Sequence, residues 1–379
     1  MIDIGNKCCG CGNCAAVCPK HCIEMKADTK GFLHPIIDED ACIHCGKCER
    51  TCPVLNANAK RAEDTAFFAA INNNKADRAA GSSGGFFPVL AEYVLEHNGV
   101  VFGAAFNEDA HHLRHVFIAK KEDLKVLRGS KYVQSDLEQS IARAEGFLKA
   151  GRQVLFTGTP CQIAALYAFL EKPYSNLITM DVICHGVASP LLWRKYTEEL
   201  EVRNKSKMRN AAFRDKKYGW RAFSMCISFQ NGKTYRQFFK QDPFGKAFLS
   251  NLMLRPSCFE CSFKTIQRPS DFTAGDFWGN GKLMPDDDYG ISLILIHSEQ
   301  GKRIWKDISK CFECMELSKE CAVKGNTPLY ESVKCNMDID RFYDRVSHEG
   351  FSNAVKGYIP NIVTVKQRIR YFVKKIGLK

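Results

Sequence analysis

The stretch CCGCGNCAAVCP, residues 8–19, spaces Cys8, Cys11, Cys14 and Cys18 as C-x2-C-x2-C-x3-C and places a proline directly after them. The same spacing, again followed by proline, returns at Cys42, Cys45, Cys48 and Cys52. Three thiolates at two-residue intervals in a tight loop can each bind one iron of a 4Fe–4S cubane. The fourth cysteine lies on the next turn and faces away, toward a second cluster. The repeat therefore predicts two clusters with interlocked ligand sets.

The interlocking fixes which cysteines share a cluster. We expect cluster one to be held by Cys8, Cys11, Cys14 and Cys52, and cluster two by Cys42, Cys45, Cys48 and Cys18. The alternative is a pair of zinc sites, but zinc ligands usually come as two pairs rather than as this repeated run. Two cysteines fall outside the register, Cys9 and Cys22, and we expect them to be free thiols.

Composition limits the class of protein around this repeat. The chain has 379 residues, of which 45% are hydrophobic and 25% charged, so a disordered or collagen-like chain is excluded. No apolar run is long enough to span a membrane, and the first residues do not read as a secretory signal. We therefore expect a cytoplasmic protein, in which 19 cysteines indicate metal thiolates rather than disulfides.

After the repeat, the pattern changes to that of an α/β protein. The segment Gly81-Ser82-Ser83-Gly84-Gly85 precedes an amphipathic helix that extends to about His97. A Gly/Ser loop at a helix N-terminus can bind a phosphate through its backbone N–H groups, although such residues also cap helices that bind nothing. His111, His112 and His115 are expected to be loop and exposed-strand residues without a site.

A βαβ unit follows, with strands over 154–157 and 177–184 and a helix over 161–170. Such strands are parallel, and ligands gather where they end. Cys161 and Cys184 fall at that edge, and Cys258-Phe259-Glu260-Cys261 could supply two more thiolates for a third 4Fe–4S cluster. The helix N-terminus would favour the thiolate form of Cys161. The alternative is that Cys161 and Cys184 are small buried core residues.

Motifs in a fixed order give the chain a resemblance to a known family. They are Gly81–Gly85, Gly129-Ser130-Lys131-Tyr132-Val133, Phe156-Thr157-Gly158-Thr159-Pro160-Cys161-Gln162, Ile183-Cys184-His185-Gly186, Phe213-Arg214, Gly219-Trp220, Cys258-x2-Cys261 and Gly275-Asp276-Phe277-Trp278-Gly279. Over residues 65–320 this set resembles the beta subunit family of coenzyme F-420 hydrogenases and dehydrogenases. The resemblance implies an irregular α/β domain that binds FAD and a 4Fe–4S cluster, and it supports the same four cysteines as ligands.

The resemblance also implies where FAD would bind. The expected contacts are Ser82, Ser83, Gly84, Lys131, Tyr132 and Arg214. Two of these have ordinary alternatives, because Lys131 could be a solvated loop lysine, and Arg214 could form a structural stacking pair with Trp220. No catalytic residue is predicted.

The combination of cofactors suggests a function. A hydride carrier moves two electrons together, 4Fe–4S clusters move one at a time, and a flavin converts between them. We therefore expect an oxidoreductase that passes electrons between an F-420-like carrier, NAD(P)H or ferredoxin and a substrate or partner protein. The alternative is a non-catalytic carrier, a ferredoxin fused to a docking domain. The net charge of +12 is too diffuse to indicate nucleic-acid binding.

The predicted fold is an α+β ferredoxin-like domain followed by an irregular α/β domain with a mixed, partly parallel sheet. Its boundaries are residues 1–56 for the ferredoxin, 57–65 for a linker, 66–340 for the α/β domain and 341–379 for a basic helical tail. The tail has Val365, Ile369, Phe372 and Ile376 at helical spacing, and we expect that face to pack on the body. Docking to an acidic partner or anionic membrane is the alternative. Cys311-x2-Cys314 repeats the C-x2-C spacing, but we expect this pair to lie at the end of a helix and in a loop and to bind no metal.

Overall fold

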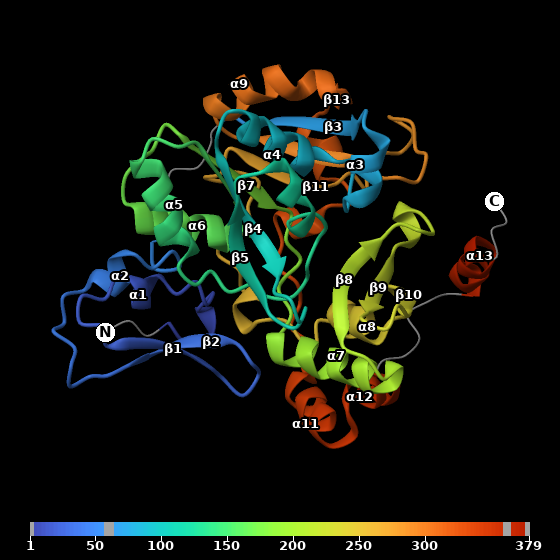
Figure 1. Cartoon of the computed structure of the whole chain (residues 1–379), viewed down its shortest axis with the longest axis horizontal. Helices are drawn as coiled ribbons and strands as arrows, with labels where there is room; N and C mark the ends of the chain where they lie inside the picture. The colour runs from blue at the N-terminus through green and yellow to red at the C-terminus, as the bar shows by residue number, and fades with distance from the viewer. Residues whose placement is uncertain (1–3, 57–63, 359–364, 376–379) are drawn as a thin grey trace.

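The computed structural model describes residues 4–56, 64–358 and 365–375, which leaves most of the predicted linker outside the described residues. The first of these segments forms a small N-terminal unit (Figure 1). Its strands β1 (Ile23–Ala27) and β2 (Leu33–Ile37) are antiparallel, and its short helices are η1 (Gly5–Lys7), α1 (Asn13–Ala16) and α2 (Lys47–Arg50). Gly12 and Gly46 precede α1 and α2 with φ of 78° and 69°, a conformation that favours glycine.

A mixed sheet of eight strands forms the centre of the second region. Its strands are β3 (Ala66–Asn72), β4 (Val100–Phe106), β5 (Leu113–Ile118), β6 (Val154–Gly158), β7 (Leu177–Val182), β11 (Phe272–Asp276), β12 (Ser292–Ile296) and β13 (Phe312–Glu316), in the order β13-β3-β12-β11-β7-β6-β4-β5. The pairs β11–β7, β7–β6 and β6–β4 are parallel, and the others are antiparallel. The predicted fold class and the predicted parallel βαβ unit are both confirmed.

Helices cover both faces of this sheet. On one face α4 (Phe86–Glu96) and α9 (Glu299–Ile308) pack over β12 through Leu90, Ile294 and Trp305. On the other face α5 (Ser140–Lys149) and α6 (Pro160–Leu170) pack over Phe102 and Phe156. Consecutive residues of β4, β6 and β7 point alternately to the two faces of the sheet, and both faces are covered by helices. Because most positions in these strands are then buried, most of their residues are apolar.

A second core lies beside the sheet. Here β8 (Met208–Asp215), β9 (Ser224–Phe229) and β10 (Thr234–Phe238) form an antiparallel sheet, in which β9 and β10 are joined by a turn at Asn231-Gly232. It packs against α7 (Pro190–Asn204), α8 (Pro243–Leu249), α11 (Ile339–Glu349) and α12 (Phe351–Tyr358). Because Phe342, Phe351 and Val355 are buried in this core, the first part of the predicted tail is integrated into the body.

The remaining elements are short or peripheral. They are α3 (Lys75–Ala80), α10 (Lys319–Val323), η2 (Lys121–Val126), η3 (Trp220–Ala222), η4 (Pro256–Cys258), η5 (Ser309–Cys311), η6 (Thr327–Leu329) and α13 (Val365–Lys375). Cys314 lies on edge strand β13, paired with β3, so the predicted loop there was wrong. Alternating residues 312–316 form too short a run to distinguish from a loop by pattern alone.

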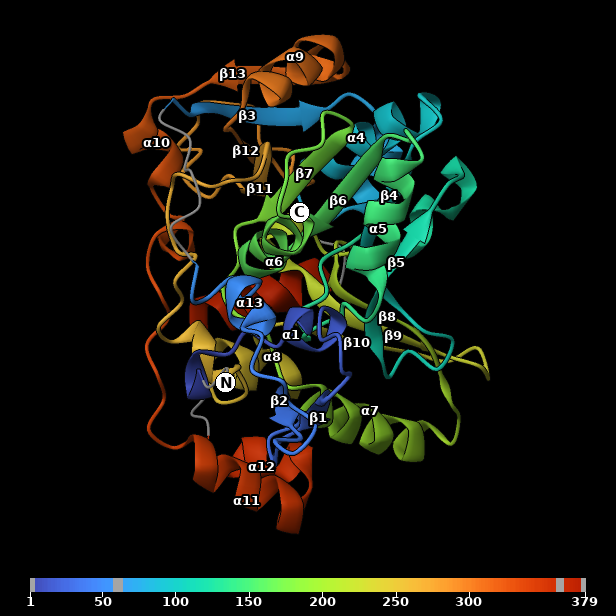
Figure 2. The same ribbon diagram turned by 90° about the vertical axis from the view of Figure 1, so that its left-hand side faces the viewer.

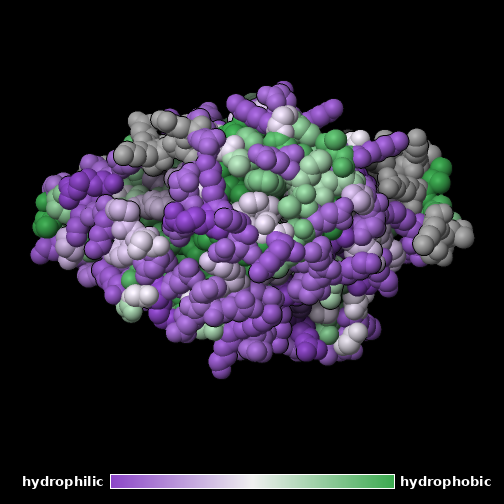
Figure 3. All heavy atoms as spheres, turned by 90° about the horizontal axis from the view of Figure 1, so that it is seen from above, coloured by the Kyte–Doolittle hydropathy of each residue, from purple (hydrophilic) through white to green (hydrophobic). Residues whose placement is uncertain are grey.

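Helix α13 packs differently from the prediction. Tyr371 is buried and stacks on Phe238, with ring centroids 4.2 Å apart, whereas Ile369 and Phe372 are 60% and 64% exposed. The side chains of Val365 and Ile376 are outside the described residues. Hydrophobic atoms are visible at the end of the molecule where Figure 1 places α13 (Figure 3). Within the described ranges, no helix is long and apolar enough to cross a membrane.

Candidate cluster and cofactor sites

The cysteines assigned to cluster one lie together in the N-terminal unit. Cys8, Cys14 and Cys52 are all buried. The pKa of the Cys52 thiol is raised first by burial and then by the nearby charge of Cys8. The pKa of Cys14 is raised to about 12, again mainly by burial, with smaller effects from Cys8 and Cys52. Cys52, which ends the second motif, therefore lies beside the cysteines of the first motif.

The reciprocal arrangement holds for cluster two. Cys18, Cys42, Cys45 and Cys48 line one pocket together with Cys22. The Sγ atoms of Cys18 and Cys22 are 3.4 Å apart, and Cys22 also interacts with Cys42. Cys45 is exposed. Cys18 thus faces the cysteines of the second motif, which is the arrangement that interlocked ligand sets require.

The N-terminal unit is docked tightly on the larger body, below α6 and beside α7 (Figures 1 and 2). Arg255, 1% exposed, donates from Nε to the Cys8 carbonyl at 2.6 Å and from Nη2 to the Leu33 carbonyl at 2.8 Å. The buried Asn13 side chain donates to the Ala165 carbonyl of α6 at 2.7 Å. Gln134 Nε2 donates to the Cys9 carbonyl at 3.0 Å. These contacts fix the loop of the first motif against the second region.

The four other predicted ligands converge where this loop meets the body. Cys161 lies in the first turn of α6, Cys184 follows β7, Cys258 ends η4, and Cys261 comes three residues later. All four line one pocket, and we call this group the third-cluster site. Burial is the main cause that raises the pKa of the Cys184 thiol to about 12; the charge of Lys264 opposes this rise, and those of Cys161 and Cys261 add to it. The structure therefore brings the sequence-predicted set together.

Charged side chains brace this site. The Lys264 ammonium donates to the carbonyls of Cys184 and Pro328, the latter at 2.8 Å. Behind it the fully buried Arg268 donates to Asp181 at 2.9 Å and to the Leu329 carbonyl at 3.1 Å. A buried ion pair that also donates hydrogen bonds to backbone carbonyls holds the surrounding backbone in one conformation. Because Asp181 lies on β7 and Arg268 follows Cys261, the pair aligns the two halves of the site.

A polar chain holds the start of α6. Thr159 and Gln162 form a capping box, Gln162 Nε2 donates to Ser135 Oγ at 2.9 Å, and Ser135 Oγ lies 3.0 Å from Nδ1 of His115. His115 is 3% exposed, so the expectation of an exposed-strand histidine was wrong. Its backbone lies on β5 at the sheet edge, but the ring is enclosed: it stacks on Phe156 with ring centroids 5.6 Å apart, and its Nε2 lies 2.9 Å from the Thr157 carbonyl oxygen. Burial lowers the pKa of His115 to about 4.

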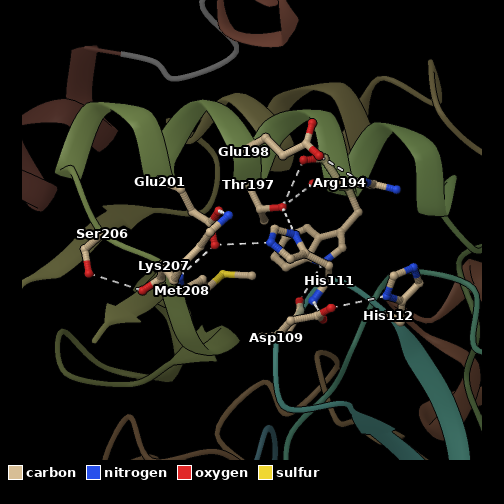
Figure 4. A network of polar contacts seen from close by, with 12 residues as sticks. Asp109, His111, His112, Arg194, Thr197, Glu198, Glu201, Ser206, Lys207 and Met208 are labelled. Carbon is tan, nitrogen blue, oxygen red and sulfur yellow. Dashed lines mark hydrogen bonds and ion pairs between the residues drawn. The ribbon is translucent and has the colours of Figure 1, made fainter. Parts of the chain in front are cut away.

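His111 also has defined partners, which Figure 4 shows between the β4–β5 turn and α7. Its Nδ1 lies 2.8 Å from Thr197 Oγ1, and its Nε2 lies 3.1 Å from Glu201 Oε1. Glu201 in turn accepts from the Met208 backbone N–H at 2.7 Å. His112 is exposed on the same turn. This network joins the large sheet to α7 and β8, and it contains no group aimed at a cavity.

The predicted flavin contacts from the glycine-rich loop are partly engaged in the fold. Ser83 Oγ donates to the carbonyls of Gly275 and Ile291 at 3.2 and 2.9 Å. A Cβ added at Gly84 would lie 2.4 Å from the Ala70 carbonyl oxygen, so glycine is needed there for close packing. Ser82 Oγ accepts from the Ser130 backbone N–H at 2.6 Å. These residues thus connect the 81–85 loop to β3, β11 and the 129–133 segment.

The other three predicted contacts lie next to this loop. Lys131 Nζ donates to carbonyls of its own loop, including that of Arg128 at 3.0 Å. Tyr132 stacks on Phe248, with ring centroids 4.8 Å apart, and its hydroxyl interacts with Arg214. Arg214, on β8, forms a buried ion pair with Asp276 at the end of β11. Its Nε is buried and has no hydrogen-bond partner among the described residues.

Two residues near Arg214 were not predicted as functional. Asp276 accepts from Arg214 and from Trp220 Nε1, the latter at 2.7 Å, while Trp220 stacks on Trp278 with ring centroids 4.5 Å apart. Lys216 Nζ donates to three carbonyls, including that of Ser83 at 2.7 Å. Burial lowers the pKa of Lys216 to about 7, and the charge of Arg214 lowers it further. In the sequence, the family motif over residues 275–279 could have indicated a functional role for Asp276. No motif in the sequence pointed to Lys216.

Within the described ranges, no set of three or more His, Cys, Asp or Glu side chains converges closely enough to hold a single metal ion. A cubane separates its four thiolates more widely than a single ion does. Cys311 and Cys314 lie at η5 and on β13, and Cys314 is exposed.

Both regions of the chain match known protein families. Residues 7–56 and 34–81 each match a 4Fe-4S dicluster domain. Residues 151–320 match the family of the C-terminal part of the "Coenzyme F420 hydrogenase/dehydrogenase, beta subunit". Residues 151–320 belong to this family. All four cysteines of the third-cluster site and Arg214 are inside the matched segment, whereas the 81–85 loop, Lys131 and Tyr132 precede it.

Two individual proteins are also similar to parts of this chain. Over 55 residues the chain is 42% identical to NADH-quinone oxidoreductase subunit I of Pelobacter propionicus, which covers 12% of this chain and 30% of that protein. This chain thus spans less than a third of that curated relative. A solved structure of the F420-reducing [NiFe] hydrogenase complex from Methanosarcina barkeri contains a chain with a TM-score of 0.46 and 17% identity, covering 76% of this chain and 93% of that one. On the family matches, the chain is an iron–sulfur electron-transfer protein of an oxidoreductase-related family.

Proposed function

We propose that this protein is a flavin-containing oxidoreductase that passes electrons from a hydride carrier, through FAD and a third 4Fe–4S cluster, to clusters one and two. An F-420-like deazaflavin or NAD(P)H is the proposed carrier class. The observation that carries the proposal is the placement of Cys161, Cys184 and Asp276 at one edge of the sheet, where β6, β7 and β11 end. Ligands of parallel sheets collect at this edge.

The third-cluster site fits a cluster by its chemistry. Its four thiols line one pocket, and each is half-buried behind a loop that Arg268 and Lys264 hold by hydrogen bonds to its carbonyls. Thiolates are the usual ligands of iron–sulfur clusters, and positive charge nearby offsets the negative charge of a reduced cluster. The resemblance, now supported over residues 151–320, points to the same four positions.

The flavin site is supported by two unpaired donors. Arg214 Nε and Arg128 Nε are buried without partners among the described residues, and they flank the 81–85 loop and the 129–133 segment. A buried guanidinium N–H without an acceptor is costly, so an oxygen-rich or nitrogen-rich group bound there would satisfy it. The isoalloxazine edge and the phosphates of FAD both offer such acceptors.

When bound there, FAD would accept two electrons as a hydride and release them singly. The chain's own residues would position the flavin and handle its proton. Arg214, held in place by Asp276 and Tyr132, would orient the polar edge of the ring. Lys216, whose pKa burial lowers to about 7, could take up or return one proton at Nζ near neutral pH. The Trp220–Trp278 pair covers this region beside Asp276.

The test is anaerobic purification followed by quantitation of flavin, iron and acid-labile sulfide, and then reduction by NADPH, NADH and reduced F-420 in separate assays. The proposal predicts about one flavin and about twelve irons per chain, with flavin bleaching preceding cluster bleaching for at least one carrier. A protein with clusters that binds no flavin from a stoichiometric excess of FAD would contradict it.

One observation favours the second candidate, a non-catalytic electron carrier. The side chains of Ser83 and Lys131 both donate hydrogen bonds to backbone carbonyls of this chain, as residues with a structural role do. A carrier of this kind would hold its clusters, bind no flavin and exchange electrons with a separate enzyme. The same flavin quantitation separates the two functions.

A further inference from the structure

Three consecutive aspartates, residues 286–288, join three separate parts of the chain. Each pairs with a basic side chain from a different element: Asp286 with Arg221 of η3 at 2.7 Å, Asp287 with Arg78 of α3 at 2.7 Å, and Asp288 with Lys374 of α13. The run therefore connects the C-terminal helix to the elements beside the proposed flavin site.

The helix α13 is attached to the body by two side chains that are three residues apart and so lie on one face of the helix. Tyr371 is 7% exposed and stacks on Phe238. Lys374 Nζ donates to the Tyr218 carbonyl at 2.9 Å and to the carboxylate of Asp288. The seat of α13 is therefore the end of β10 together with the turn that precedes η3.

This turn is shaped to admit the Lys374–Asp288 ion pair. Gly219 has a φ of 97°, a conformation that favours glycine. A Cβ added at Gly219 would lie 2.8 Å from Lys374 Nζ and would collide with the Asp288 carboxylate. A side chain at this position would thus displace the ion pair.

Asp288 passes this contact on to Trp220. Its carbonyl accepts from the Trp220 backbone N–H at 2.6 Å, and its Oδ1 accepts from the Arg221 backbone N–H at 2.8 Å. The fully buried Trp220 donates from Nε1 to Asp276, which in turn accepts from Arg214. A continuous series of contacts therefore leads from α13 to the arginine of the proposed flavin site.

The same junction holds the glycine-rich loop. Arg78, which pairs with Asp287, also donates from Nε to the Gly290 carbonyl at 2.9 Å. Lys216 Nζ donates to the carbonyls of Arg78 at 2.8 Å, Ser83 at 2.7 Å and Tyr289 at 2.7 Å. Residues 286–290 are thus fixed against the 81–85 loop on one side and against α13 on the other.

We propose that α13 is a strap and that Lys374 is its positioning residue: by holding Asp288, Lys374 fixes Trp220 and, through it, the Asp276–Arg214 pair. The inference rests on the FAD of the proposed function. Without Lys374 the turn at residues 218–222 would open more often. Part of the binding free energy of FAD would then be used to order Arg214, so the affinity for FAD would fall.

The chain supplies matched variants for this contact. Lys374→Met removes the donors but keeps an unbranched side chain, whereas Lys374→Arg keeps a cation with several donors. Lys375 is the next residue of the same helix and is exposed, so Lys375→Met removes the same charge without touching Asp288. Asp288→Asn removes the other half of the ion pair, and its effect should not add to that of Lys374→Met.

The experiment uses the full-length protein, purified anaerobically, as wild type and as each of these variants. It measures the dissociation constant of FAD and, without FAD, hydrogen exchange of the backbone amides over residues 216–222. We expect Lys374→Met and Asp288→Asn to weaken FAD binding about fivefold, the lower end for coupling between separate sites, and to speed exchange at Trp220 by a similar factor. Lys374→Arg and Lys375→Met should match wild type.

A spectroscopic readout separates positioning from a general loss of stability. The visible circular dichroism of bound FAD, which reports the groups around the ring, should change in Lys374→Met and return in Lys374→Arg. If wild type binds FAD and Lys374→Met binds it equally well, or if exchange at Trp220 is unchanged, the inference is overturned while the proposed function stands. An equal loss of affinity in Lys375→Met would also overturn it, because the charge of α13 would then matter rather than this contact. A wild type that binds no FAD contradicts the proposed function, and the inference falls with it.

Discussion

Arg255 donates a hydrogen bond from Nε to the main-chain carbonyl of Cys8 at 2.6 Å, although the two residues are 247 positions apart in the chain. The guanidinium also donates to Gln134 Oε1 at 3.0 Å and lies over the Phe32 ring, 5.4 Å from its centroid. A charged side chain that satisfies three acceptors at a buried contact holds that contact in one geometry. The ferredoxin-like unit is therefore attached by its cluster-one loop rather than by its exposed cluster-two end.

Replacing Arg255 should loosen this attachment. Arg255→Ala leaves the carbonyls of Cys8 and Leu33 without their donor, and we expect a loss of about 3 kcal/mol in the free energy of unfolding. Arg255→Lys keeps the charge, but a lysine cannot reach all of these acceptors at once. The free energy of unfolding of Arg255→Lys should therefore lie between those of wild type and Arg255→Ala. Anaerobic urea denaturation measures the difference; an Arg255→Ala protein as stable as wild type would show that the contact contributes little.

The interlocked ligand sets predict that losing a cysteine of one motif removes the cluster held mainly by the other motif. Cys18→Ala should abolish cluster two, held with Cys42, Cys45 and Cys48, and leave cluster one intact. The physical reason is that Cys18 lines the pocket of the second motif, while Cys52 lies beside Cys8. EPR of the reduced variant distinguishes the clusters, and Cys52→Ala is the reciprocal control. Selective loss of cluster one in Cys18→Ala would mean that each motif holds its own cluster.

Arg214 should be needed for flavin retention. Arg214→Met keeps the length of the side chain but removes the unpaired Nε donor and the partner of Asp276. We expect at least a tenfold weaker affinity for FAD, equivalent to about 1.4 kcal/mol, measured by flavin fluorescence during dilution. Arg236→Met is a suitable control, because it breaks a comparable ion pair with Asp215 away from the 81–85 loop. Equal flavin affinity in the Arg214 variant and wild type would remove this residue from the proposed site.

Stability should fall as the solution becomes moderately acidic. His115 has a folded-state pKa of about 4, lowered mainly by burial, against about 6.5 in the unfolded chain. Between these values the unfolded state binds more protons, so stability is lost as pH falls from about 6.5 toward 4. The effect is on the order of 2 kcal/mol by pH 5. His115→Gln should show a smaller drop in Tm between pH 7.5 and 5.5 under anaerobic conditions; an unchanged pH dependence would contradict the assignment.

The basic C-terminal helix gives a further test. Ile369 and Phe372 are exposed while Tyr371 holds α13 on β10, so these two apolar side chains face outward on a helix whose sequence is rich in Lys and Arg. If these side chains contact anionic membranes, binding to phosphatidylserine vesicles should weaken with salt and should fall in Ile369→Ser/Phe372→Ser. Neutral vesicles are the control. Absence of binding to both kinds of vesicle would leave α13 as a structural helix.

Much of the central sheet could be predicted from the sequence, because strands that are buried on both faces appear as uninterrupted apolar runs. β6 is a continuous apolar run, and its predicted limits, 154–157, agree with the structure to within a residue. The spacing of Cys161 and Cys184 in a βαβ unit was enough to place both at one edge, because parallel strands all end on the same side. Edge strand β13 and helix α7 were not predicted, since the pattern of β13 is short and that of α7 carries many charges.

Contacts between distant segments could not be predicted from pattern alone. Arg255 looked like an ordinary basic residue before a C-x2-C pair, and only the docking of the two regions shows that it is buried against Cys8. Cys9 falls outside the motif register, yet the same docking places it in the pocket that the four cysteines of the third-cluster site line. His115 was predicted to be exposed because local sequence does not show that Phe156 and Ser135 enclose its ring.

The most direct test of the account is the iron and acid-labile sulfide content of the full-length protein beside Cys258→Ala, both reconstituted anaerobically. Three 4Fe–4S clusters predict about twelve irons per chain in wild type and about eight in the variant, with clusters one and two retained by EPR. About eight irons in both proteins would contradict the third cluster and the electron path proposed from it.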